Sequence, residues 1–391
     1  MALHEDLFAC DNTNMQTDKL STSVFTYAFP AIRGVQAGRE YFVSMCPLRL
    51  IPKLFQFDDE ELQPELRAQR TLNRARIPEI ARYIIDNSSS YTFSAITASI
   101  DGEVNFDPVG QGNANVFAMG TLTVPMEAKF IINDGQHRRA AIEQALQTAP
   151  EIGDETIAVV FFVDRGLQRC QQMFADLNRY AVKPSASLSI LYDHRNETAK
   201  VAKHLCLTSP VFKNLVETER STLSARSRKL FTLSALHFAT QELLTEKAAE
   251  NFEAATQRSQ QFWLWVSEQI PEWGYVRTSK MTAGEVRSDF IHCHAIVLQA
   301  LGRAGRALYE QYPKEVRKRL QHLRKVDWAR SNQPTWEGRA MLGGAMAKSG
   351  QNITLTTNAI KQILGLTLSP EEHNSEAAWK ASRAPRSNSK A

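Results

Sequence analysis

The sequence predicts a mixed α/β amino-terminal domain followed by a mainly α-helical carboxy-terminal domain. Short β-favouring runs such as TYAFPAIRG and IAVVFFV fill the first half. There, FIINDGQHRRAAIEQAL passes from a β-favouring run through a polar turn into apolar residues at helical spacing. From about Ser209 to about Leu364, long amphipathic stretches show little β pattern. With 391 residues and 43% hydrophobic content, the chain is long enough for two domains with sizeable cores.

The chain begins with a polar segment and then changes to short apolar runs. Residues 1–24 lack a sustained period, which predicts a loose arm. From Phe25 to Ile51, apolar runs separated by Gly34 and Gly38 predict a hairpin-like pair of strands.

A basic stretch follows. RAQRTLNRARIPEIARYIID predicts two helical segments that break before Pro78, because proline removes a helical hydrogen bond. Arg70 and Arg74 lie one helical turn apart, a spacing that suits one shared phosphate. A solvated helix face paired with the acidic residues Asp58–Glu61 explains both arginines equally well.

Two segments lead from there to the centre of the chain. Tyr91–Ile100 is rich in β-formers and is followed by the turn signal Asp101-Gly102, which predicts a strand. Pro108–Ala118, PVGQGNANVFA, is rich in glycine and asparagine. Because GQGN lacks the lysine and the spacing of a P-loop, a surface connection is predicted there.

The central feature is the polar stretch NDGQHR, which lies between a predicted buried strand at Lys129–Ile132 and a predicted helix. Gly135 permits a tight turn at this point. Asp134 is placed to accept hydrogen bonds from the amides of the first helical turn.

These features predict an anion site at the start of the helix. The free amides and the helix dipole favour negative charge, and Arg138 and Arg139 add positive charge. His137 adds a group that titrates near neutrality. The alternative is a capped helix with a solvated basic first turn.

A strand and a second helix come next. Ile157–Val163 is a continuous apolar run, which predicts a buried strand covered on both faces. The helix from Leu167 to about Tyr180 carries Asn178 and Arg179 in its last turn. From the residues alone, Asn178 is a polar residue near a helix end, and Arg179 interacts favourably with the helix dipole.

The residues Asp134–Arg138, DGQHR, match the signature of the DGQHR-domain family. From about Thr26 to about Leu205 the chain resembles the DndB family, regulatory members of bacterial DNA phosphorothioation systems. The likeness includes Arg70–Tyr83 and Phe174–Pro184. It implies a ParB-like α/β domain whose signature turn faces a ligand, and it makes Asn178 and Arg179 candidates to share that ligand.

The predicted helical domain contains aromatic and histidine clusters that invite other interpretations. Trp263, Trp265 and Trp273 lie close together, and aromatic residues at this spacing are predicted to be core. His292-Cys293-His294 does not predict a metal site, because adjacent helical residues point in different directions.

Positive charge is concentrated in this second half. The whole chain has a net charge of +4, whereas Leu301–Ala340 alone holds ten basic and four acidic residues. A second cluster, Arg220–Lys229, mixes basic residues with serines. Such side chains neutralise a DNA backbone without reading bases, so salt-dependent DNA binding is predicted. A solvated charged face is the alternative.

Composition and termini complete the domain prediction. The expected parts are the arm at 1–24, an α/β domain at 25–207, a helical domain at 208–366 and a disordered polar tail at 367–391. Five scattered cysteines without a CxxC pair indicate reduced thiols. With no apolar run of bilayer length and no basic-apolar leader, a soluble cytoplasmic protein without a membrane partner is expected.

The leading functional hypothesis is a DNA-binding regulator of a DNA phosphorothioation operon or of its modification machinery, with double-stranded DNA as partner. The alternative is an enzyme that hydrolyses a nucleoside triphosphate or nicks DNA, with Asp134, His137 and Arg138 as catalytic candidates. Against it, two-metal sites need several carboxylates, and only Asp134 is obvious.

A third hypothesis is a scaffold that contacts other sulfur-modification proteins. A homo-oligomer is compatible with all three. No cofactor is assured, and a nucleoside triphosphate with Mg is the one considered. The predicted phosphate- or nucleotide-binding residues are Asp134, Gly135, Gln136, His137, Arg138, Asn178, Arg179, Arg70 and Arg74. The predicted DNA-binding residues are Arg226, Arg228, Lys229, Arg317, Lys318, Arg319, Arg324 and Lys325.

Overall fold

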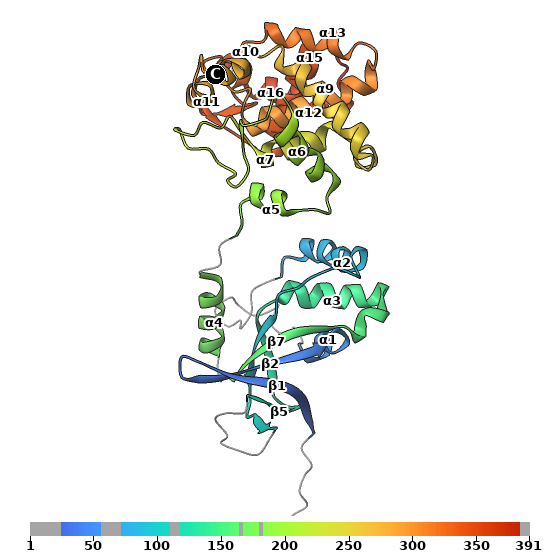
Figure 1. The fold of residues 1–391 in the computed structure, drawn as a ribbon, viewed down its shortest axis with the longest axis vertical. Coiled ribbons are helices and arrows are strands. Elements are labelled where there is room, and N and C mark those ends of the chain that lie inside the picture. The colour runs from blue at the N-terminus through green and yellow to red at the C-terminus, as the bar shows by residue number, and fades with distance from the viewer. Residues whose placement is uncertain (1–24, 56–71, 110–117, 164–166, 180–182, 384–391) are drawn as a thin grey trace, which may run out of the picture. The chain divides into compact units, whose positions relative to one another are not determined.

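The computed structural model describes residues 25–55, 72–109, 118–163, 167–179 and 183–383. The chain divides into two units, residues 1–182 and residues 183–391. The first unit carries a mixed sheet and the second is built mainly from helices (Figure 1). The predicted order of an α/β part followed by a helical part is therefore confirmed.

One seven-stranded sheet forms the centre of the first unit. Its spatial order is β4-β5-β1-β2-β7-β3-β6, and β3 and β7 are its parallel pair. The other neighbours run antiparallel. The strands are β1 (Thr26–Gln36), β2 (Arg39–Pro47), β3 (Ile96–Asp101), β4 (Asn105–Pro108), β5 (Met119–Pro125), β6 (Lys129–Asp134) and β7 (Thr156–Val163).

Helices cover both faces of this sheet. Alternate strand residues such as Phe42, Ile132 and Phe161 are buried in one core, which α1 (Ile51–Leu54), α2 (Ile77–Asp86) and α3 (Gln136–Thr148) complete. The helix α4 (Leu167–Arg179) lies on the opposite face (Figure 1). Short 3-10 turns η1 (Leu48–Leu50), η3 (Arg74–Arg76) and η4 (Pro150–Asp154) adjoin α1, α2 and α3.

The predicted hairpin, the strand before NDGQHR and the helix after it are found in this unit, with one correction at β7. The strand predicted within 91–100 begins at Ile96, and the predicted arm at 1–24 and most of the predicted surface connection at 108–118 lie outside the described residues. The expected hairpin is β1 and β2, which join through Ala37 and Gly38 at φ values of 51° and 73°. The strand before NDGQHR is β6. In contrast, β7 is not buried on both faces, because its residues alternate between buried and half-buried. Its antiparallel neighbour β2 shows the same alternation, as in a sheet with one fully packed face.

The helical unit contains α5 to α16 and two short strand pairs. The helices are α5 (Ala186–Tyr192), α6 (Glu197–Thr208), α7 (Leu233–Leu243), α8 (Glu246–Ala249), α9 (Phe252–Ser267), α10 (Pro271–Arg277), α11 (Ala283–Asp289), α12 (Ala295–Gln311), α13 (Val316–Leu320), η5 (Gln321–Lys325), α14 (Gln333–Trp336), α15 (Gly350–Ile363) and α16 (Pro370–Arg383). The strand pairs are β8 (Val216–Glu217) with β9 (Phe231–Thr232), and β10 (Met341–Leu342) with β11 (Ala345–Met346).

Close packing of α12 against α7 organises this unit. A Cβ atom added at Gly302 would lie 2.2 Å from the carbonyl oxygen of Ala239, and one at Gly305 would lie 2.6 Å from the ring of Phe262. The two glycines therefore allow the helix to approach its neighbours more closely than any side chain permits. Trp263 and Trp273 are fully buried here, as predicted for core residues.

Two expected boundaries differ from the structure. The helices α5 and α6 belong to the helical unit, since Ile190, Val201 and Leu205 lie in its core. The division therefore falls after Val182 rather than after residue 207. The expected disordered tail from residue 367 is also corrected, because Pro370–Arg383 forms α16.

His292 is a buried titratable group in the helical core. Its side chain is fully buried, and its Nδ1 accepts a hydrogen bond of 3.0 Å from Nε1 of Trp273. Burial lowers the pKa of His292, although Glu272 opposes that shift from 3.5 Å. The imidazole is therefore neutral in the fold at neutral pH.

We expect Gly302→Ala to lower the free energy of unfolding by about 1–3 kcal/mol, because the added methyl forces α12 away from α7. Thermal unfolding followed by circular dichroism measures the change. Gly274→Ala is the matched control: it lies within α10 with no close neighbour and should be neutral or stabilising by about 0.5–1 kcal/mol. Equal melting temperatures for the two variants would contradict the packing interpretation.

The buried His292 predicts a loss of stability in acid. Its pKa is lower in the folded than in the unfolded state, so its contribution is present above the unfolded-state pKa and disappears as the pH falls through the folded one. Between pH 7.5 and pH 5 we expect this group to remove on the order of 1 kcal/mol. Denaturant unfolding at several pH values should show a shallower pH dependence for His292→Asn than for the parent protein.

Candidate functional site

The DGQHR residues form a corner between the end of β6 and the start of α3. Asp134 is the last residue of β6, and α3 begins at Gln136. Between them Gly135 has a φ of 112°, a left-handed conformation that side chains rarely adopt. The tight turn predicted at Gly135 is therefore present, and no side chain caps the amino terminus of α3 from that position.

Arg138 is bound within this corner. Its guanidinium donates to the hydroxyl of Ser94, to the carbonyl oxygen of Ala95 at 3.1 Å and to the Asp134 carboxylate at 2.7 Å. Only 19% of the Arg138 side chain is exposed. This corrects two expectations: the Asp134 carboxylate accepts from Arg138 instead of the helix amides, and the Arg138 charge is neutralised internally. Asp134 and Arg138, both considered as catalytic residues, are paired with each other, so either would have to leave this ion pair to act in catalysis.

Arg139 has a structural contact on the other side of α3. It is 6% exposed and donates to the carbonyl oxygens of Phe55 at 2.8 Å and Pro52 at 3.1 Å, and to the Glu143 carboxylate. Burial lowers the pKa of Arg139, and Glu143 partly offsets that shift. Arg139 ties the end of α1 to α3, so the expectation that it adds charge to an anion site is wrong.

His137 connects the corner to the basic segment before α2. Its Nε2 accepts a hydrogen bond of 3.1 Å from the backbone N–H of Asn73. The next residues, Arg74 and Arg76, are exposed on η3. The structure therefore brings Arg74 and His137, distant in sequence, to the same region, whereas Gln136 is buried. Arg70 lies outside the described residues.

A buried polar contact joins β6 to α4. Asn133 is 1% exposed, and its Nδ2 donates to Oγ of Ser99 at 2.7 Å and to Sδ of Met173 at 2.9 Å. Sequence patterns did not single out Asn133, although an asparagine within a buried strand is itself a signal. Asn178 and Arg179 are exposed at the end of α4, where Asn178 donates to the carbonyl oxygen of Phe174 in the same helix.

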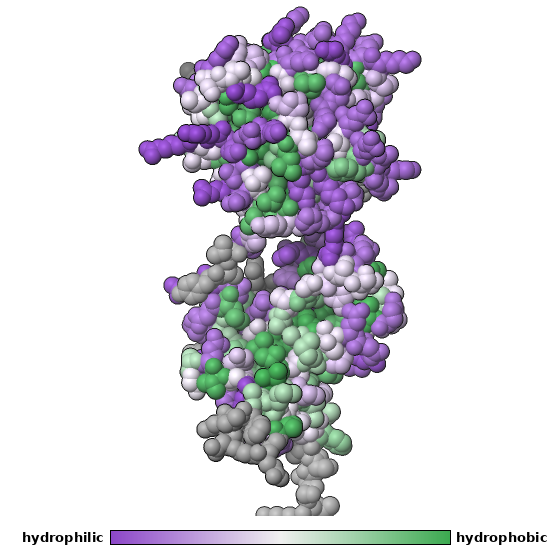
Figure 2. Space-filling view, in the orientation of Figure 1, coloured by the Kyte–Doolittle hydropathy of each residue, from purple (hydrophilic) through white to green (hydrophobic). Residues whose placement is uncertain are grey.

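The helical unit carries an exposed group of cations on and beside α13 and η5, here called the α13–η5 patch. The backbone of this segment is anchored by the buried side chains of Val316, Leu320 and Leu323. In Figure 2 the surface around α13 is hydrophilic. The members of the patch are Lys314, Arg317, Lys318, Arg324 and Lys325, all exposed.

Arg319, predicted to bind DNA with this group, points inward instead. Its guanidinium donates to the carbonyl oxygens of Leu364 and Gly365, both at 3.1 Å, and to Glu315 at 3.2 Å. It also lies 3.4 Å from the ring centre of Tyr312. These contacts use three of its five N–H donors for packing within the helical unit, and the predicted DNA contact of Arg319 stays a prediction.

Other basic residues of 301–340 also make internal contacts. Arg303 pairs with Glu242 at 2.7 Å, and Arg306 donates to backbone carbonyl oxygens at the end of α7. Arg339 is buried and paired with Glu376. Net charge over the segment therefore overestimates the cations available to a ligand.

The second predicted cluster is a loop held by one arginine. Arg287 of α11 donates to the carbonyl oxygens of Ser224, Ala225, Ser227 and Lys229. This anchoring leaves Arg226 and Arg228 exposed. Lys229 is half-buried, and its ammonium group donates to the carbonyl oxygen of Asn214 at 2.9 Å.

Metal and membrane features were also considered for the described ranges. Within them, no group of three or more His, Cys, Asp or Glu side chains is arranged to hold a metal ion. In the His292-Cys293-His294 run, His292 bonds Trp273, while Nε2 of His294 contacts the Arg287 carbonyl oxygen at 2.9 Å. None of the helices described there has the length and apolar character needed to cross a bilayer.

Comparison with known proteins identifies one family. A family model described as "DndB: DNA-sulfur modification-associated" matches residues 29–367, which include both the DGQHR corner and the α13–η5 patch. No curated protein and no solved structure matches the chain.

The inward contacts of Arg138 predict that this position needs the guanidinium group and not charge alone. Arg138→Lys should lower the free energy of unfolding by about 1–3 kcal/mol, since the three donors of an ammonium group lie on one nitrogen and cannot match acceptors placed around two guanidinium nitrogens. Arg76→Lys, an exposed neighbour, is the control and should leave it unchanged. Chemical denaturation measures both, and an Arg138→Lys protein as stable as its parent would show that the corner does not depend on these bonds.

Proposed function

Because this chain belongs to the DndB family, we propose that it is a double-stranded DNA-binding regulator of a DNA sulfur modification system. The observation that carries the proposal is the α13–η5 patch, five exposed cations within a segment of twelve residues. The family supplies the link to modified DNA. The patch supplies a surface suited to a phosphate backbone.

The cations of the patch are available for phosphates. Arg317 lies 3.4 Å from Glu268, but the two side chains are 62% and 39% exposed, and such a surface pair is weak. Phosphates that replace this contact and bind the neighbouring lysines release condensed counterions from DNA. Binding through such contacts is strong at low salt and falls steeply as salt rises.

The patch is also presented on a fixed backbone. Buried Leu320 and Leu323 anchor it from below, and Arg319 fastens it to the end of α15. A rigid segment loses less conformational entropy on binding than a mobile tail does. Arg226 and Arg228, held outward by the Arg287-anchored loop, are proposed as additional backbone contacts.

The DGQHR corner is proposed as a separate phosphate site with a reduced set of residues. Support comes from Gly135, which has no Cβ and takes a positive φ at the amino terminus of α3, and from the approach of η3 to His137. In this proposal Arg74 and His137 contact the phosphate, while Asp134 and Arg138 hold the corner in shape. A ParB-like character of the first unit, with Asn178 and Arg179 near the ligand, belongs to the same proposal.

Removing cations from the patch should weaken DNA binding and its salt dependence. For Lys318→Ala/Arg324→Ala/Lys325→Ala we expect at least a ~10-fold loss of affinity for a duplex at about 100 mM salt. The slope of log K against log salt should fall by about 2–3, since each phosphate contact contributes about 0.9. Fluorescence anisotropy over a salt series measures both quantities.

The matched control removes the same charge elsewhere. Lys53, Lys129 and Lys280 are exposed and lie outside the patch, so their triple alanine variant should keep nearly the parent slope. Melting curves confirm that both triple variants fold. If the two variants lose affinity equally, general charge and not the α13–η5 patch determines binding.

A further inference from the structure

The carboxy-terminal helix α16 packs on the helical unit mainly through charged groups. Its sequence, PEEHNSEAAWKASR, holds one large apolar side chain, Trp379, which is half-buried and whose ring centre lies 3.9 Å from the guanidinium carbon of Arg339. Its buried residue is a glutamate, Glu376. Apart from Trp379 the helix buries little apolar surface, so electrostatic contacts contribute much of its attachment.

Two carboxylates of α16 neutralise two cations beneath it. The carboxylate of Glu376 accepts hydrogen bonds of 2.7 Å from both terminal nitrogens of Arg339. The side chains of Glu376 and Arg339 are only 5% and 6% exposed. The carboxylate of Glu372 accepts a hydrogen bond of 2.6 Å from the ammonium group of Lys361 on α15. Each cation is sheltered from water beside a carboxylate of α16.

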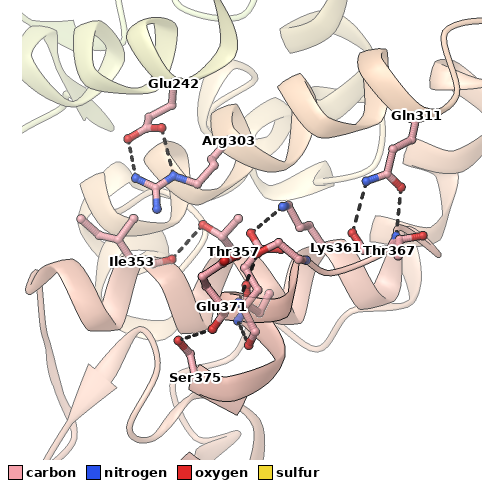
Figure 3. A network of polar contacts seen from close by, with 12 residues as sticks. Glu242, Arg303, Gln311, Ile353, Thr357, Lys361, Thr367, Glu371 and Ser375 are labelled. Carbon is pink, nitrogen blue, oxygen red and sulfur yellow. Dashed lines mark hydrogen bonds and ion pairs between the residues drawn. The ribbon is translucent and has the colours of Figure 1, made fainter. Parts of the chain in front are cut away.

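A third cation, Arg303, lies near Glu372. Arg303 pairs with Glu242 of α7, and the negative charge of Glu372 adds to the rise in the pKa of Arg303. Figure 3 shows Arg303 beside Glu242, with Lys361 of α15 and Glu371 of α16 in the same network of polar contacts. Through Glu372 and Glu376, the first half of α16 therefore covers a positively charged surface.

This covered surface adjoins the α13–η5 patch. Lys361 lies in the last turn of α15, and the residues that follow it accept hydrogen bonds from the patch segment. His322 contacts the carbonyl oxygen of Ile363, and Arg319 donates to Leu364 and Gly365. A phosphate backbone bound across α13 and η5 would therefore extend toward Lys361 on contiguous elements.

We propose that α16 is an exchangeable acidic cover over a second DNA-phosphate surface, formed by Lys361 and Arg339. This inference rests on the proposed DNA binding of the patch. Phosphate oxygens accept the same charge-assisted hydrogen bonds from Lys and Arg as the carboxylates of α16 do. DNA thus competes with Glu372 and Glu376 for these cations, and the affinity of the protein for DNA is limited as long as α16 stays in place. The family match ends at residue 367, so the surface lies within the matched region and α16 lies outside it.

The test compares two adjacent glutamates in the full-length protein. Glu372→Gln removes the charge opposite Lys361 while keeping an oxygen for the helix cap that Ser369 shares. Glu371→Gln removes the same charge from an exposed side chain, which accepts a hydrogen bond from the hydroxyl of Ser369. Anisotropy with duplex DNA should give about 3- to 10-fold tighter binding and a slope larger by about 1 for Glu372→Gln. Glu371→Gln should stay within about 2-fold of the parent.

Hydrogen exchange provides a direct readout of the helix. In the parent protein, saturating DNA should speed exchange of the α16 amides and leave those of α12 unchanged. DNA binding with α16 still protected, or equal effects of the two glutamine variants, overturns the cover and leaves the proposed function standing. A parent and a Glu372→Gln variant that both fail to bind DNA at low salt overturn the proposed function itself.

Discussion

Arginine side chains that donate to backbone carbonyl oxygens hold both units of this protein in shape. Arg139 ties α1 to α3 in the first unit. In the second, Arg287 gathers the loop at 224–229, and Arg319 fastens α13 to the end of α15. A planar guanidinium carries five N–H donors on three nitrogens, so it reaches acceptors that lie further apart than the single nitrogen of a lysine can serve. These contacts position a loop and two short helices relative to the elements on which they pack.

The same contacts separate structural cations from cations available to a ligand. Within residues 301–340, Arg303, Arg319 and Arg339 are engaged internally, while the α13–η5 patch remains exposed. The engaged arginines support the exposed ones, since Arg319 fixes the backbone that presents the patch. The basic residues of this segment therefore either hold its structure or face solvent. On α15, Lys361 is instead paired with a carboxylate of α16.

Much of the fold could be predicted because it follows from local patterns. The strand, turn and helix around Gly135 are encoded by a β-favouring run, a glycine and helical spacing, and the structure reproduces them. The helical tail was missed because α16 is polar and pairs with residues distant in sequence. At the candidate site, the approach of Asn73 to His137 was equally invisible, since it depends on how α2 packs against α3.

The sequence by itself determined the order of the two parts, the DGQHR turn and the concentration of basic residues in the second half, because periodicity, turn chemistry and composition are local properties. Only the tertiary structure decided which of those basic residues are free to meet a phosphate. A guanidinium is used internally when a carbonyl or carboxylate is brought within hydrogen-bonding distance, as happens to Arg138 beside the carbonyl oxygen of Ala95 and to Arg339 beside Glu376. That distance is a property of packing between remote segments, which no local pattern contains.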